Sequence, residues 1–197
     1  MSSLVTFLET ALYMIFVQNL VFSGGYGSSE AIRMSAKPKR FVPFSIMITY
    51  FSTLTAFVCR LLDNIDAVDS LGLGFHTLIF GAVLVVIFIF TVLLCKILLS
   101  PNQKFYSTIS IAALNTLVFA VPLINRQAGF SLIQSVGTGI GSGLSFIIAL
   151  FLINTGLRRL ENNTNIPPLF KGTPAVFLYV AMLSIAFAGL SGRSLFA

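Results

Sequence analysis

Six long apolar runs constrain the fold of this chain more than any other feature of its sequence. They lie at roughly residues 4–22, 41–60, 73–99, 105–124, 130–157 and 174–191. A run of about 18 or more apolar residues can cross the hydrocarbon core of a bilayer as a helix. Only 9% of the residues are charged, whereas about a quarter are charged in a soluble domain. The sequence therefore predicts an all-α integral membrane protein with six transmembrane helices, in which residues 1–197 form one membrane domain.

The positions of the basic residues predict the orientation of these spans. Nine of the twelve follow spans 1, 3 and 5: Arg33, Lys37, Lys39, Arg40, Lys96, Lys104, Arg158, Arg159 and Lys171. The other ends hold Arg60, Arg126 and Arg193, with an acidic loop at Asp63, Asp66 and Asp69 that we expect to be solvated. Because short cytoplasmic loops are enriched in Lys and Arg, both termini are expected to be extracytoplasmic. The basic pI follows from these loops, so we exclude nucleic acid as a partner.

The first apolar run is unusual because it contains polar residues and ends in glycines. It reads MIFVQNLVFSGGYGSSEAIR over residues 14–33, with Gln18 and Asn19 inside it. A related phrase, LNTLVF, occupies residues 114–119 and contains Asn115. An Asn side chain can satisfy the backbone groups that a helix break leaves free. We interpret Gln18, Asn19 and Asn115 as markers of helix interruptions near residues 18–27 and 114–122; a surface loop after a short first span is the alternative.

The two related phrases predict an internal repeat. Each stands in the first of three consecutive spans, so repeat one covers about residues 1–100 and repeat two about residues 101–197. An odd number of spans per repeat gives the two halves opposite orientations in the membrane. Inverted repeats of this kind carry interrupted helices near the middle of the bilayer, and such breaks must be buried in protein or line a cavity.

Four glycines alternate along the fifth span, in the phrase VGTGIGSG. They are Gly137, Gly139, Gly141 and Gly143. A nucleotide-binding loop would need a preceding strand and a βαβ unit, which this sequence does not offer. Small residues at this spacing instead favour the close approach of neighbouring helices.

The sequence offers little evidence for catalysis or metal binding by this chain alone. Cys59 and Cys95 are predicted at opposite membrane faces, about 25–30 Å apart at 1.5 Å per residue, whereas a disulfide needs Cα atoms within about 7 Å. His76 is the single histidine, so two-histidine haem ligation and a Ser-His-Asp set lack support. Glu9 lies near a span end, where it can reach the interface. We expect no catalytic residue and no metal ligand.

The phrases LIQSVGTGIGSGLSFIIALF, RRLE and PPLFKGTPAVFLYVAMLSIAFAGLSG in the last third of the chain resemble a known family. Together with VQNLVF in the first span, they are similar in order and spacing to the A subunit of the Rnf electron-transport complex, equivalent to the E subunit of the sodium-pumping NADH:quinone oxidoreductase, Nqr. The resemblance extends over nearly the whole chain. It implies six helices in an inverted repeat, in a bacterial plasma membrane.

The resemblance also implies a cofactor that this sequence is poorly equipped to bind. The family subunit pairs with a homologous subunit of opposite orientation, and each contributes two cysteines to a shared iron–sulfur cluster. Those positions fall on Ser29 and Thr116 in this chain. Because such clusters are held mainly by cysteine thiolates, we expect no 2Fe–2S cluster bound as in the family, although a partner could supply all four ligands.

Two functions from different classes follow. The leading hypothesis is a membrane subunit of an Rnf/Nqr-like electron-transfer complex, which scaffolds cytoplasmic and extracytoplasmic redox subunits that carry flavin or quinone. Its membrane partner would be the homologous subunit or a second copy of this chain. The alternative is a small solute or ion transporter built on the inverted repeat.

Overall fold

The computed structural model describes residues 3–98, 103–165, 167 and 170–191, and all regular elements within these ranges are helical. The predicted all-α membrane class is confirmed. Five helical stretches are long and apolar enough to cross a membrane: Pro38–Asp63, Gly74–Leu98, Phe105–Gln127, Leu132–Glu161 and Thr173–Leu190.

The first apolar run does not form a continuous span. It consists of α1 (Ser3–Leu12), a π-helical turn η1 (Tyr13–Val17), α2 (Leu20–Ser23) and α3 (Ser28–Ser35). The segment Ser3–Val17 is shorter than the other candidate spans, because the helix stops at Gln18 and Asn19. The helix break therefore lies inside the apolar run 4–22, at the start of the interruption that the sequence predicted near residues 18–27.

The remaining elements are also helical, and α7 and α8 together form one candidate span. The first half continues with η2 (Pro38–Arg40), α4 (Phe41–Asp63), α5 (Asp66–Asp69) and α6 (Leu73–Leu98). The second half contains α7 (Gln103–Ala113), α8 (Thr116–Gln127), α9 (Leu132–Glu161) and α10 (Thr173–Leu190). The expected boundary near residue 100 and the residue Arg193 lie outside the described residues.

The second interruption is shorter than the sequence suggested. It is confined to Leu114 and Asn115, after which α8 continues through Pro122 to Gln127. The expected break over residues 114–122 is wrong in its second part. Pro122 removes one backbone donor, yet it is buried in the interior of α8 without ending the helix.

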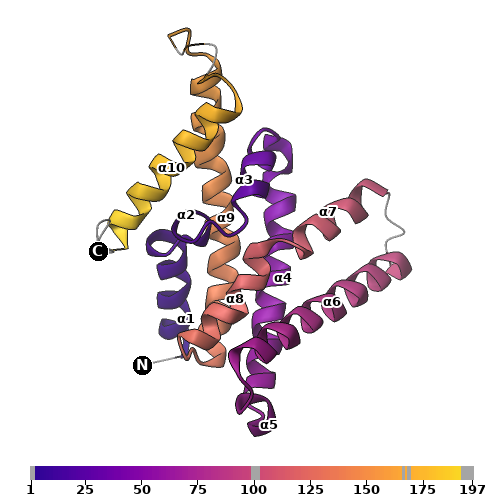
Figure 1. The fold of residues 1–197 in the computed structure, drawn as a ribbon. Coiled ribbons are helices and arrows are strands. Elements are labelled where there is room, and N and C mark those ends of the chain that lie inside the picture. Colours follow the sequence, from indigo (N-terminus) through magenta and orange to yellow (C-terminus); the bar gives the residue numbers. More distant parts are fainter. Residues whose placement is uncertain (1–2, 99–102, 166, 168–169, 192–197) are drawn as a thin grey trace.

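Helix α9 lies at the centre of the bundle (Figure 1). Its glycines are in close contact with two neighbouring helices. A Cβ atom on Gly139 would lie 2.5 Å from the Thr53 Cα of α4. A Cβ on Gly141 would lie 2.7 Å from the Ala11 carbonyl oxygen of α1. Gly143 and Gly137 repeat these contacts with Thr49 of α4 and Phe7 of α1. The alternating glycines therefore let two helices approach α9 on different faces.

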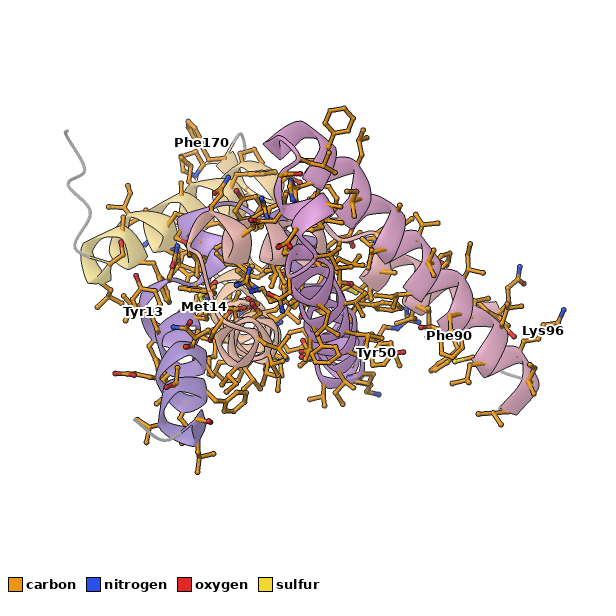
Figure 2. All side chains as sticks on the ribbon, turned by 90° about the horizontal axis from the view of Figure 1, so that it is seen from below. Tyr13, Met14, Tyr50, Phe90, Lys96 and Phe170 are labelled. Atoms are coloured by element: carbon orange, nitrogen blue, oxygen red, sulfur yellow. The ribbon has the colours of Figure 1, made fainter. Side chains whose placement is uncertain are left out.

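Helices α6 and α10 extend outward from this centre (Figure 1). In the most apolar 18-residue stretch of each helix, 22% of the residues of α6 and 17% of those of α10 are buried inside the protein. The corresponding share for α9 is 61%. Figure 2 shows Phe90 and Lys96 on the part of α6 that projects away from the bundle. These two helices are the third of each half, so both halves leave their last helix largely uncovered.

Candidate functional site

The first interruption is organised by Asn19. Its backbone is extended (φ −63°, ψ 106°) and its Oδ1 accepts a hydrogen bond from the Val21 amide at 3.1 Å, which caps α2. Its Nδ2 donates to the Ser145 carbonyl of α9 at 3.1 Å. Asn19 is fully buried, so both bonds form away from water, where an unpaired group costs about 1–3 kcal/mol. Gln18 is half-buried beside it, and the backbone amide of Gln18 donates a hydrogen bond to the Tyr13 backbone carbonyl.

The second interruption repeats the same capping chemistry. Asn115 is extended (φ −73°, ψ 134°) and its Oδ1 accepts from the Leu117 amide at 2.9 Å, again two residues ahead. Asn115 is also buried, but its Nδ2 has no hydrogen-bond partner among the described residues. The two breaks therefore share one local geometry and differ in how each is joined to the rest of the bundle.

The two interrupted segments meet at Gly27. This residue has a positive φ of 72° and precedes α3. Its amide donates to the Thr116 Oγ1 at 2.8 Å, and a Cβ atom at Gly27 would lie 2.6 Å from the Asn115 Oδ1. Only glycine combines this backbone conformation with this approach. The segments after both breaks thus cross in direct contact, which we call the crossover (Gly27, Asn115 and Thr116).

The two positions that the family resemblance assigns to cluster ligands lie at this crossover. Thr116 is part of it, and Ser29 is two residues beyond Gly27 in the first turn of α3. Both side chains are exposed. Thr116 also lines a hollow of about 510 Å³ with Tyr26 and Phe119. The crossover is therefore buried on the side of Asn115 and open on the side of Thr116.

A second polar cluster lies where α4 and α8 end and α6 begins. The Arg126 Nη1 is 3.2 Å from the Asp63 Oδ1 and 3.0 Å from the Asp69 Oδ1. The His76 Nε2 is 3.5 Å from the Asp63 Oδ1, and its Nδ1 is 3.1 Å from the Gly72 carbonyl oxygen. The cluster joins helices of both halves of the chain at one end of the bundle.

This cluster corrects the expectation of a solvated acidic loop at Asp63 alone, because Asp66 and Asp69 are exposed as expected. The side chains of Asp63 and His76 are 2% and 0% exposed, whereas that of Asp69 is 64% exposed. The sequence did not predict that Asp63 is buried, because its partner Arg126 is far away in the chain. The one available signal was that Arg126 and Asp63 stand at ends of spans on the same predicted membrane face.

The other sequence candidates lie apart from the crossover. Cys59 on α4 and Cys95 on α6 are buried free cysteines. Within the described residues no group of three or more His, Cys, Asp or Glu side chains could hold a metal ion. Glu9 is exposed on α1.

These features define a helical membrane protein built around two interrupted helices that meet at one half-buried contact. The chain belongs to the Rnf-Nqr subunit family of membrane proteins, whose family model matches residues 7–193. It is 32% identical to the A subunit of the ion-translocating oxidoreductase complex of Aromatoleum aromaticum, over 94% of this chain and 94% of that protein. It is 26% identical to the A subunit of the Na⁺-translocating ferredoxin:NAD⁺ oxidoreductase complex of Acetobacterium woodii, over 92% of this chain and 94% of that protein.

Proposed function

We propose that this chain is a membrane subunit of an Rnf/Nqr-like electron-transfer complex that joins partner redox subunits without ligating an iron–sulfur cluster itself. The observation that carries the proposal is the crossover, which brings the two halves together beside Ser29 and Thr116. The full-length similarity to subunits of ion-translocating oxidoreductase complexes supports it.

The donor atoms at the crossover do not fit an iron–sulfur cluster. Ser29 and Thr116 offer hydroxyls, which are much less acidic than thiols, and clusters are held by thiolates. The Thr116 Oγ1 already accepts the Gly27 amide proton. We infer that electrons pass through carriers in partner subunits, such as flavin or quinone, and that this chain supplies the scaffold around them.

The open side of the crossover is the proposed contact surface for a second membrane subunit. Tyr26, Phe119 and Leu123 line the hollow beside Thr116, and mainly apolar hollows on membrane proteins suit a neighbouring helix. A homologous subunit of opposite orientation would complete it, with a second copy of this chain as the alternative occupant.

The two halves, residues 1–100 and 101–197, are proposed to be inverted repeats. The matching Asn caps at residues 19 and 115 and the outward position of the third helix in each half (Figure 1) support this. The distribution of Lys and Arg supports connections 1, 3 and 5 in the cytoplasm of a bacterium and both termini outside.

The test is purification of the native complex through a tag on this chain. Co-purifying subunits are identified by mass spectrometry, and iron, acid-labile sulfide, flavin and haem are assayed in the same sample. We expect redox subunits with bound flavin. A single colourless chain that transports a solute in liposomes without a redox partner would contradict the proposal and support the transporter.

A further inference from the structure

Two apolar grooves lie along α4, one beside its first turns and one beside its middle, and both are lined by one shared residue. The first groove, about 460 Å³, lies between α4 and α7 and is lined by Phe105, Met47 and Met34 of α3. The second, about 750 Å³, runs between α4 and α9 and is lined by Leu54, Leu144 and others. Ile46 lines both grooves and is 55% exposed, so it forms the ridge between them.

A cationic rim lies at the end of the first groove. Arg40 is the single charged residue among those that line it, and Lys37 and Lys39 are exposed in the same short turn before α4. None of these three has an ion pair within the described part of the chain, whereas Arg33 is paired with Glu30 at 3.0 Å. The rim therefore carries three positive charges without a protein counter-charge.

The arrangement matches the chemistry of one class of molecule. A phospholipid carries one anionic phosphate and two acyl chains, and here two apolar grooves diverge from one cationic rim. A guanidinium matches the geometry of a phosphate because it can donate two parallel hydrogen bonds. Basic pockets between transmembrane helices bind anionic head groups in this way. A quinone has a neutral head and a single tail, so it would leave the rim uncompensated and one groove empty.

We propose that this chain binds an anionic phospholipid, with the head-group phosphate at Arg40 and one acyl chain in each groove on either side of Ile46. The lipid would fill the space between α7, α4 and α9 at the end of the bundle where η2 lies. This site is separate from the crossover and does not depend on the electron-transfer proposal.

The test uses native mass spectrometry of the purified full chain in detergent, with phosphatidylglycerol and phosphatidylcholine added in competition. Three variants are compared with the unchanged protein. Arg40→Gln removes the charge at the rim and Ile46→Trp adds bulk at the ridge. Arg159→Gln is the matched control, because Arg159 is an exposed arginine near the end of α9 that does not line either groove.

We expect the unchanged protein and Arg159→Gln to retain phosphatidylglycerol over phosphatidylcholine. Arg40→Gln should reduce retained phosphatidylglycerol about tenfold, as for the loss of a charge-assisted hydrogen bond, and Ile46→Trp should reduce retention of both lipids. Equal retention of the two lipids by the unchanged protein would overturn the proposal. So would identical loss in Arg40→Gln and Arg159→Gln, full retention in Ile46→Trp, or a bound quinone in place of lipid. Thermal unfolding of each variant without added lipid checks that it is folded.

Discussion

At the scale of single residues, the crossover depends on the absence of a side chain at one position. Gly25 and Gly27 have nearly the same φ, 70° and 72°, both in the left-handed region. A Cβ atom at Gly25 would meet nothing within 4 Å, whereas one at Gly27 would meet the Asn115 Oδ1 at 2.6 Å. A comparison of the two positions therefore separates the free-energy cost of a left-handed backbone from the cost of the close contact between residue 27 and Asn115.

Replacing each glycine by alanine should reveal that difference. Both variants pay about 1–2 kcal/mol for a left-handed residue with a Cβ atom. Gly27→Ala must also displace the Asn115 cap, which is worth about 1 kcal/mol more. In detergent we expect the unfolding midpoint of Gly27→Ala to lie below that of Gly25→Ala by about 2–4 °C. Equal midpoints would show that the approach of Gly27 to Asn115 does not constrain the protein.

The two capping asparagines make a second comparison. Asn19 forms two buried hydrogen bonds, to Val21 and Ser145, whereas Asn115 forms one and its Nδ2 finds no partner in the described part of the chain. Both alanine variants lose a cap, worth about 0.5–2 kcal/mol. Asn19→Ala also leaves the Ser145 carbonyl without that donor, so it should lower the unfolding midpoint more. A larger loss in Asn115→Ala would contradict this assignment of bonds.

The sequence was informative about these residues only where the chemistry is local. A cap acts on an amide two residues ahead, so the pairing of Asn with LVF-like phrases indicated both breaks. The contact of Gly27 with Thr116 joins residues 89 positions apart. Nothing in the pattern around either residue specifies such a partner, because tertiary packing determines which segments cross.

At the scale of elements, Arg126 joins the end of α8 to the connection between α4 and α6. It pairs with the buried Asp63 and with the exposed Asp69. Loss of one partner of a buried ion pair leaves an uncompensated charge, at a cost of about 3–5 kcal/mol, whereas a pair with an exposed partner is worth about 1 kcal/mol or less. We therefore expect a larger loss of stability when the pair with Asp63 is broken than when the pair with Asp69 is broken.

Arg126→Gln should destabilise the protein by about 3 kcal/mol, since it leaves Asp63 with the weaker support of His76. Asp69→Asn, the control, should cost less than about 1 kcal/mol. Denaturation in mixed micelles measures both. If Asp69→Asn matched the loss in Arg126→Gln, the exposed pair rather than Asp63 would hold α8 in place.

The approximate bounds of the long helices could be predicted from hydropathy alone. The long apolar runs correspond to α4, α6, α9 and α10 and to the α7–α8 pair. Hydropathy could not show that α6 and α10 project outward while α9 is central, because apolar residues face lipid and protein alike. The alternating glycines of α9 instead indicated that this helix has close neighbours, because small residues occur where other helices approach.

At the scale of the whole molecule, the two halves bring the exposed Thr116 to Gly27, two residues before the exposed Ser29. If a partner subunit contributes two cysteines, as the family resemblance implies, this chain lacks the other two. Restoring thiols at both positions would then complete a four-thiolate set. One restored thiol would leave the set incomplete.

The experiment compares the purified complex carrying Ser29→Cys with Thr116→Cys against each single variant and the unchanged complex. We expect iron and acid-labile sulfide in equal amounts only in the double variant, because each single variant supplies three thiolates at most. Cys59 and Cys95 are buried elsewhere in α4 and α6, so they do not compensate. Iron and sulfide in the unchanged complex at the same level would mean that the partner supplies every ligand. Their absence from the double variant, in a complex that still assembles, would mean that the crossover no longer faces a thiolate-bearing partner.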